Sequence, residues 1–297
     1  MTLSPNLLGA AYMTGAMAAF TINDTFFKLL GAELPFFQVL FLRAVAVIIL
    51  LYALARHYGA LRLPGGRDRW LIVLRTVAEI GAAYFFLTAL TRMPLANVSA
   101  ILQALPLTVT LGAALFLGEQ VGWRRWAAIV IGFAGVYLIV RPGGDGFTID
   151  SIYALISVLC VTIRDLASRR LSADVPSLGV AFAAAVGVLA FSAIGALGTE
   201  WQPVSAIQVF WLAGAVVSIV GGYLLSVTSM RVGETAVVAP FRYTSLLVAL
   251  VLGLLVFGDW PDQVTLLGAG IVVATGLFTL WRERRARHNV PVGLRVR

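Results

Sequence analysis

The stretch LANVSAILQALPLTVTLGAALFLGEQVGWRRWAAIVIGFAGVYLIV, residues 95–140, decides the fold because it recurs later in the chain. Its second copy is TAVVAPFRYTSLLVALVLGLLVFGDWPDQVTLLGAGIVVATGLFTLW, residues 235–281. Residues 117–119 (Leu-Gly-Glu) fall on residues 257–259 (Phe-Gly-Asp), a lag of about 140 residues. Such self-similarity at a fixed lag indicates an internal repeat.

The two copies carry opposite charge in corresponding loops. In the first copy Trp123 is followed by two arginines, whereas in the second Trp260 is followed by Pro261 and Asp262, with no base before Arg282. Basic loops stay in the cytoplasm, so the copies should cross a membrane in opposite directions. An inverted repeat of apolar helices is typical of secondary transporters.

The composition indicates a membrane protein. Hydrophobic residues make up 60% of the 297, charged residues 12%, and the mean hydropathy is +0.93, whereas a soluble domain has about 45–50% apolar and about 25% charged residues. The net charge of +8 comes from arginines placed between apolar runs, which favours a topology signal over nucleic-acid binding. The single cysteine allows no intrachain disulfide. Because the chain has no nucleotide, zinc-protease or Cys/His motif, we expect no cofactor, no metal and no ATP-driven transport.

Apolar runs predict ten spanning helices, since a span needs about 20 residues. The predicted spans are 7–29, 35–55, 70–91, 94–117, 123–140, 151–168, 176–198, 206–229, 235–257 and 263–281. One set of alternating loops and the tail hold fifteen Lys and Arg residues, and the other set holds three. This asymmetry predicts that both termini lie in the cytoplasm.

The repeat extends along nearly the whole chain. Matched pairs include Tyr12 with Tyr153, Asp24 with Asp165, Lys28 with Arg169, and Tyr84 with Tyr223. We therefore expect an all-α integral membrane fold of two inverted five-helix repeats around a central cavity. The first repeat spans residues 1–142, the second 143–282, and a basic cytoplasmic tail covers 283–297.

These residues resemble the EamA-type branch of the drug/metabolite transporter superfamily. The resemblance rests on the Leu-Gly-Glu turn at 117–119, Pro106, the glycines of 123–140, and APFRYTS (239–245) followed by a glycine-rich last helix. It implies ten helices and a cavity that opens alternately to each side. The branch most similar to this chain includes bacterial exporters of aromatic amino acids and also S-adenosylmethionine carriers.

Charged residues inside the predicted spans are expensive and usually face a partner or a wet cavity. Asp24 and Arg43 have similar predicted depths on neighbouring helices, so we expect them to be in contact, either as part of an extracellular gate or as a structural pair. The remaining residues of the predicted gates or structural ion pairs are Lys28, Asp165 and Arg169.

Arg242 follows Pro240 in the predicted ninth span, and an arginine fork suits a substrate carboxylate. An arginine that reaches the headgroups is the alternative. Asn23, Glu79 and Gln103 could accept from an ammonium group, although Arg75, four residues before Glu79, is an alternative partner. Tyr84, Tyr223 and Tyr243 could pack an aromatic substrate, and Ser99 lies on the same broad side as Gln103.

The sequence thus predicts an inner-membrane carrier that exports amino acids or similar zwitterions by alternating access. Uptake or exchange of a metabolite such as S-adenosylmethionine, and a membrane enzyme or receptor, stay open as alternatives. The expected partners are the substrate, the lipid bilayer and a second copy of the chain in a homodimer, without nucleic acid.

Reporter fusions test the predicted topology. Fusions at Arg67 and at the C-terminus should both report cytoplasm, because both positions belong to the base-rich set of segments. A periplasmic signal at either position would contradict the map and the inverted repeat with it.

Overall fold

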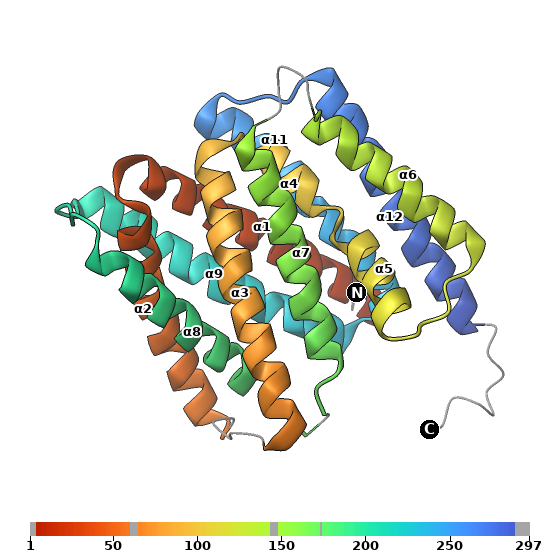
Figure 1. Ribbon diagram of the computed structural model, residues 1–297, viewed down its shortest axis with the longest axis horizontal. Coiled ribbons are helices and arrows are strands. Elements are labelled where there is room, and N and C mark those ends of the chain that lie inside the picture. Colours follow the sequence, from red (N-terminus) through yellow and green to blue (C-terminus); the bar gives the residue numbers. More distant parts are fainter. Residues whose placement is uncertain (1–3, 60–64, 143–147, 173, 289–297) are drawn as a thin grey trace. The chain divides into compact units, whose positions relative to one another are not determined.

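The computed structural model describes residues 4–59, 65–142, 148–172 and 174–288, and every regular element in these ranges is helical. The elements are α1 (Pro5–Glu33), α2 (Phe36–His57), α3 (Gly66–Arg92), α4 (Leu95–Leu102), α5 (Leu105–Phe116), α6 (Trp123–Val140), α7 (Ile149–Arg169), α8 (Ser177–Leu197), α9 (Ala206–Val232), α10 (Thr235–Val238), η1 (Ala239–Tyr243), α11 (Thr244–Leu252), η2 (Gly253–Phe257) and α12 (Gln263–His288). Figure 1 shows their course.

Each of the ten predicted spans falls on a helical segment, but the structure does not confirm the count of ten. Within the described ranges, eight segments are long and apolar enough to cross a membrane. The two that fall short are α1 and α7. Helix α1 carries Asp24 and Lys28 in its second half, and α7 carries Arg164 and Asp165 in its second half. Charged side chains lower the mean hydropathy of these helices.

Large apolar side chains on the helices face outward. Leu197 is 88% exposed, Leu255 75% and Val217 70%. Exposed apolar surface on this scale is costly in water and favourable against lipid tails. Eight apolar segments with such surfaces make the chain a multi-pass membrane protein.

Two of the predicted spans are interrupted. The span over 94–117 is divided into α4 and α5, with Pro106 in the first turn of α5. The span over 235–257 is divided into α10, the 3₁₀ turn η1, α11 and the π turn η2. Proline lacks an N–H, so each interruption leaves backbone carbonyls that need another donor.

The chain divides into two compact units, and both use helices from both halves of the sequence. Unit 1 comprises residues 1–21, 94–147 and 221–297, and unit 2 comprises residues 22–93 and 148–220. Helices α1 and α9 therefore each contribute one end to unit 1 and the other end to unit 2.

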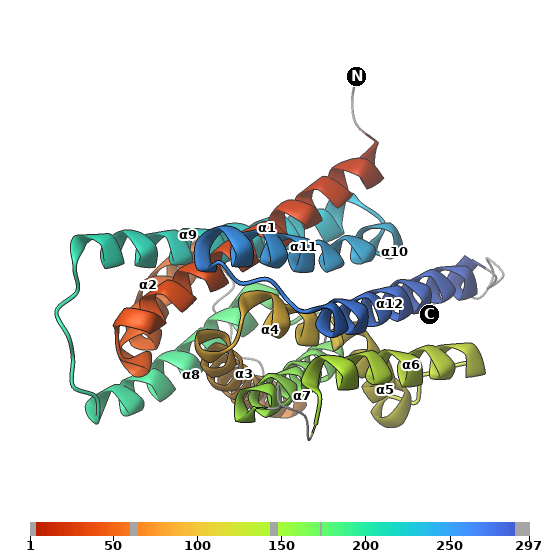
Figure 2. The same ribbon diagram turned by 90° about the horizontal axis from the view of Figure 1, so that it is seen from above.

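In unit 1, α6 and α12 lie side by side along their length (Figure 1 and Figure 2). A Cβ on Gly135 would stand 2.8 Å from the carbonyl oxygen of Gly268, and a Cβ on Gly268 would stand 2.6 Å from that of Gly135. Small residues at such a crossing let the two backbones touch, which favours helix association in a membrane.

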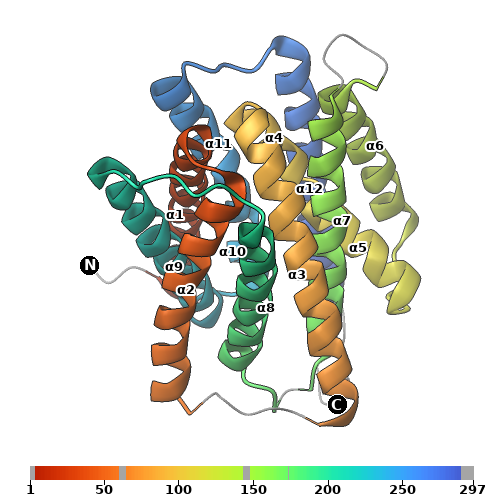
Figure 3. The ribbon, with the colours of Figure 1, turned by 60° about the vertical axis from the view of Figure 1, so that its left-hand side comes forward.

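Unit 2 is built on α3 packed against α7 and on α2 packed against α8 (Figure 3). Glycines again leave room for side chains of a neighbouring helix. The ring of Phe37 packs against Gly195, and the side chain of Thr76 packs against Gly187. The side chain of Gln38 is fully buried and exchanges two hydrogen bonds with the backbone of Gln202, of 2.7 and 2.9 Å. These contacts fix the start of α2 against the segment before α9.

The first turn of α12 is capped by Asp262. Its carboxylate accepts from the backbone N–H groups of Val264 at 2.9 Å and Thr265 at 3.0 Å, and it also pairs with Arg141. The Thr265 N–H bond, with Arg141 as a further contributor, lowers the pKa of Asp262 from its ordinary value. An acid at this position satisfies orphan N–H groups and complements the helix dipole.

Substitution of Gly268 tests the α6–α12 contact. Gly268→Ala should lower the free energy of unfolding by about 1–3 kcal/mol, because the added carbon forces the backbones apart. Gly270→Ala is the matched control on the same helix, since a Cβ there meets nothing within 4 Å. Equal effects of the two variants on unfolding in detergent micelles would contradict the close packing.

The capping of α12 makes stability depend on pH. A carboxylate whose folded pKa is lowered stabilises the fold fully above its unfolded pKa of about 3.9, and this contribution is lost as the pH falls through the folded pKa. The difference in unfolding free energy between wild type and Asp262→Asn should therefore be constant from pH 7 to about 5 and shrink at lower pH. A difference that stays constant down to pH 3 would contradict the argument.

Candidate functional site

In unit 1 the two interrupted spans meet at Gln103. Its side-chain amide donates to the hydroxyl oxygen of Ser245 at 3.0 Å and to the carbonyl oxygen of Tyr243 at 3.4 Å. Gln103 itself is only 6% exposed. One buried amide thus joins the break between α4 and α5 to the 3₁₀ turn η1.

Local side chains donate to two further carbonyls of the 3₁₀ turn. The hydroxyl of Thr244 donates to Phe241 O at 2.6 Å, and the hydroxyl of Ser245 donates to Arg242 O at 3.0 Å. With Gln103 serving Tyr243 O, three successive carbonyls have partners. A backbone interruption at membrane depth is stable only when its polar groups are paired in this way.

Tyr243 is turned away from this polar bridge. Its side chain is 6% exposed and lies against α12 at Gly276, where any Cβ would clash with the phenol oxygen. The hydroxyl has no hydrogen-bond partner among the described residues. Gly276 therefore makes room for Tyr243, and the hydroxyl is a buried polar atom that a water or a ligand could satisfy.

The other predicted substrate residues of unit 1 are less enclosed. Ser99 and Tyr223 are half-buried, and Arg242 is exposed on the 3₁₀ turn. Ser99 contributes its carbonyl to the end of α4, where Gln103 N donates to it at 3.2 Å. Of the predicted residues, the structure joins Gln103 to Tyr243 through the carbonyl of Tyr243.

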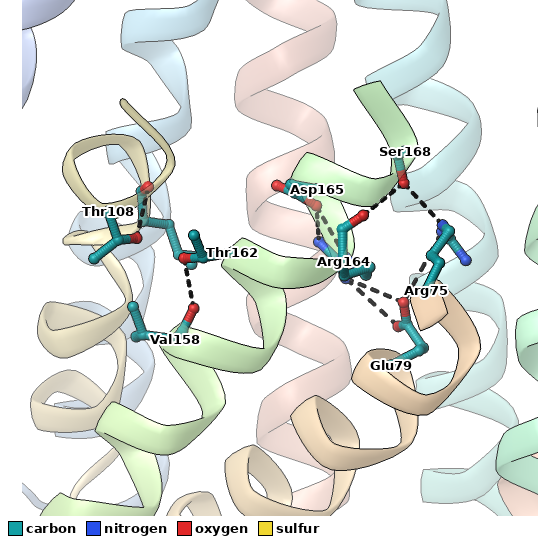
Figure 4. Close-up of polar contacts among 9 residues, drawn as sticks. Arg75, Glu79, Thr108, Val158, Thr162, Arg164, Asp165 and Ser168 are labelled. Carbon is teal, nitrogen blue, oxygen red and sulfur yellow. Dashed lines mark hydrogen bonds and ion pairs between the residues drawn. The ribbon is translucent and has the colours of Figure 1, made fainter. Parts of the chain in front are cut away.

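Unit 2 contains a charge cluster between α3 and α7 (Figure 4). Arg164 on α7 lies 3.4 Å from a carboxylate oxygen of Glu79 on α3 and 2.9 Å from one of Asp165. Arg75 approaches Glu79 less closely, at 3.9 Å, so the predicted pairing of these two is present but loose. Two arginines and two carboxylates leave the cluster without net charge.

Ser168 completes the cluster. Its hydroxyl accepts from Nε of Arg75 at 3.0 Å and donates to the carbonyl oxygen of Arg164 at 2.8 Å. Arg164 was given no role in the sequence analysis. A signal was present in the sequence, because an arginine inside a predicted span needs a negatively charged or polar partner.

Asp24 and Arg43, which we expected to be in contact, form no direct ion pair within 4.0 Å in the described part of the chain. The carboxylate of Asp24 instead accepts from the side-chain amide of Asn23 at 2.9 Å, and the Arg43 guanidinium lies over the ring of Phe27, 5.6 Å from its centroid. Asp24 and Glu79 still act on Arg43 electrostatically.

Two buried polar atoms in this part of unit 2 have no hydrogen-bond partner among the described residues. They are the side-chain oxygen of Asn23, a residue that is 3% exposed, and Nε of Arg43. One is an acceptor and the other a donor. An unsatisfied buried group costs about 1–3 kcal/mol, so such groups indicate a site for water or a polar ligand.

The remaining predicted gate residues lie at helix ends. Lys28 donates to the carbonyl oxygens of Leu90 at 2.9 Å and Met93 at 2.6 Å, which closes the C-terminal end of α3. Asp165 is held by Arg164 in the charge cluster, and Arg169 is exposed at the end of α7.

Tyr84 belongs to an aromatic cluster in unit 2. Its ring stacks on Phe37 at 6.3 Å and meets Phe36, Phe85 and Phe191 edge-on at 5.7, 5.2 and 5.8 Å. Phe36 in turn meets Phe27, the ring beneath Arg43. The aromatic cluster is thus continuous with the environment of Arg43.

No group of three His, Cys, Asp or Glu residues within the described ranges is arranged to hold a metal ion. Apolar spans, interrupted helices that meet at buried polar groups, and charges enclosed at membrane depth define a membrane transport protein. A family model described as the EamA-like transporter family matches residues 7–141 and 149–281. The chain belongs to this family of the drug/metabolite transporter superfamily.

Named relatives are similar over nearly their whole length. The S-adenosylmethionine uptake transporter of Rickettsia conorii is 26% identical over 289 residues, covering 97% of both chains. The riboflavin transporter of Vibrio cholerae is 28% identical over 95% of this chain and 96% of its own. The pseudopaline exporter CntI of Pseudomonas aeruginosa is 26% identical, and the match covers 94% of this chain and 99% of that protein.

A solved structure titled only as a crystal structure of a protein shares the fold. Its TM-score is 0.64, and the match covers 95% of this chain and 98% of that one at 18% sequence identity. The relatives carry the names of transporters, which agrees with the expectation that the chain is not an enzyme.

A double-mutant cycle tests the charge cluster. Arg164→Gln and Glu79→Gln should each destabilise the protein, and their coupling energy should be about 1 kcal/mol, modest because both side chains are partly exposed. The same cycle on Arg92 and Asp150 is the matched control. Because Arg92 is 58% exposed, this pair should give a smaller coupling energy. Equal coupling energies would remove the distinction between an enclosed cluster and a surface pair.

Proposed function

We propose that this protein is an alternating-access carrier of ten spanning helices arranged as two inverted five-helix repeats, residues 1–142 and 143–282. The lag of 140 residues that aligns the two copies places Gln103 on Tyr243. These two residues are also joined by a hydrogen bond. Contact between equivalent positions is the expected result when a pseudo-twofold axis passes between two repeats, and this supports the proposal.

The proposed substrate is a zwitterionic metabolite that carries an amino-acid group and an aromatic or adenine ring, with S-adenosylmethionine as the first candidate. The observation that carries this proposal is the unsatisfied donor of Arg43 and acceptor of Asn23 beside the aromatic cluster of Tyr84. A guanidinium suits a carboxylate, an amide oxygen suits an ammonium, and aromatic faces suit a sulfonium cation or a flat ring. Relatives named as S-adenosylmethionine uptake transporters favour the same candidate.

Specific roles follow from the positions of the side chains. Arg43 is the proposed anchor of the substrate carboxylate, Asn23 and Asp24 face the ammonium group, and Tyr84 packs against the ring. Glu79 is engaged by Arg164 in this structure, so its proposed role is in gating through the charge cluster. Arg242, Gln103, Ser99, Tyr223 and Tyr243 are the proposed substrate-contacting residues in unit 1.

Export of aromatic amino acids is the second candidate, because the same aromatic cluster and charged groups fit those smaller zwitterions. The proposal places the protein in the bacterial inner membrane with both termini in the cytoplasm. A homodimer through the outer face of α6, where Val130 and Ile131 are 65% and 53% exposed, is part of the same proposal.

Flux into proteoliposomes tests the substrate. Labelled S-adenosylmethionine should enter vesicles that contain the purified protein with saturable kinetics, and unlabelled S-adenosylmethionine inside should accelerate its entry. Flux of aromatic amino acids without S-adenosylmethionine would select the second candidate. Flux of neither would refute the proposed substrate class.

Two arginine variants test the carboxylate anchor. Arg43→Lys keeps the positive charge but loses the planar guanidinium that can bind both carboxylate oxygens, and should weaken substrate affinity by about 1–3 kcal/mol. Arg43→Gln also removes the charge and should weaken substrate affinity further. Arg242→Lys is the comparison, because Arg242 is exposed on the 3₁₀ turn. A loss of affinity only in the Arg242 variant would show that Arg242, and not Arg43, binds the substrate carboxylate. Unchanged affinity in the variants of both residues would refute an arginine anchor for the carboxylate.

A further inference from the structure

A small pocket outside the proposed substrate path lies where α6 begins and the spanning part of α12 ends. It has a volume of about 100 Å³ and is lined by Gly122, Trp123, Arg124, Arg125 and Arg282. Three arginines from two helices thus line one pocket, and none of the five lining residues is acidic. The volume admits several waters or a group of similar size, since a water takes about 30 Å³.

Within the described ranges, the ion pairs of the structure do not include the arginines of this pocket. Arg125 donates to the carbonyl oxygen of Gln120 at 3.2 Å, and Arg124 lies over the ring of Trp123, 5.3 Å from its centroid. These contacts hold the side chains in place without supplying negative charge.

The start of α6 adds to the positive potential. Its N-cap is Gly122, which has no side chain to bond the N–H groups of the first turn. Basic residues are unfavourable at a helix N-terminus unless an anion is bound there. The second repeat differs, because Asp262 caps the start of α12 and accepts the bonds that the first repeat leaves open.

We propose that this pocket binds a phosphate group, supplied by an anionic phospholipid of the adjacent leaflet. Arginine forks match the geometry of phosphate oxygens, and basic pockets at helix ends bind acidic headgroups. Trp123 is 73% exposed and Trp281 48% exposed. Exposed tryptophans at span ends lie at the headgroup level, so a lipid phosphate is at the right depth. The inference does not depend on which substrate the protein carries.

Lipid binding to the purified full chain tests the proposal. Native mass spectrometry should detect phosphatidylglycerol bound more tightly than phosphatidylcholine, whose choline cation the arginines repel. Arg124→Gln combined with Arg125→Gln should weaken phosphatidylglycerol binding on the order of tenfold or more. Arg67→Gln combined with Arg69→Gln is the matched control, since these exposed arginines precede Trp70 at the start of α3 without lining the pocket.

Two further measurements decide the outcome. Arg282→Gln removes a guanidinium from the other helix and should also weaken binding, which gives a second test if the double variant fails to fold. If inorganic phosphate displaces the lipid at equal concentration, the phosphate site stands and its ligand is soluble phosphate. Equal binding of the two lipids, or equal losses in the two double variants, would overturn the proposal.

Discussion

The structure of unit 1 depends on one buried amide that serves two broken helices. In a bilayer the backbone has no water to bond, so an interrupted helix survives only where side chains replace the lost partners. The side-chain amide of Gln103 donates to the carbonyl oxygen of Tyr243 and to the hydroxyl oxygen of Ser245. The hydroxyl of Ser245 in turn donates to the carbonyl oxygen of Arg242. The interruption at α4–α5 and the 3₁₀ turn η1 therefore support each other.

Each unit also contains close contacts between long helices. The glycine crossing of α6 and α12 brings two backbones together in unit 1, and the neutral charge cluster of Arg75, Glu79, Arg164 and Asp165 joins α3 to α7 in unit 2. Close backbone packing and paired charges resist separation, whereas side-chain bonds across a helix break can be exchanged. This contrast is what a carrier requires, because some elements must move as bodies while others change partners.

Much of the helical layout could be predicted from the sequence. Apolar runs located the helical segments, and 123–140 coincides with α6 at both ends. Pro35, Pro94 and Pro176 stand immediately before α2, α4 and α8, where a missing backbone N–H is tolerated. Pro240 lies in the 3₁₀ turn η1, and Gln103 and Pro106 lie at a second break, which the predicted span over 94–117 did not include. The reason is that an apolar window measures composition and not backbone hydrogen bonding.

The site was harder to predict than the fold. Sequence spacing gives the depth of a side chain, and depth alone suggested an Asp24–Arg43 pair. In the structure the carboxylate of Asp24 accepts from Asn23, and the guanidinium of Arg43 lies over the ring of Phe27. Arg164 was missed for the related reason that its partner Glu79 lies 85 residues away along the chain. Pairing between distant segments depends on three-dimensional packing, which one sequence does not reveal.

Hydrogen–deuterium exchange of Gln103→Leu protein tests the central claim most directly. The account predicts faster amide exchange, relative to wild type, in residues 99–108 and 239–247 together, because the two breaks share one donor. Exchange along the α6–α12 crossing should stay unchanged. Unchanged exchange at both breaks, or faster exchange at only one of them, would contradict the claim that Gln103 holds the two interruptions together.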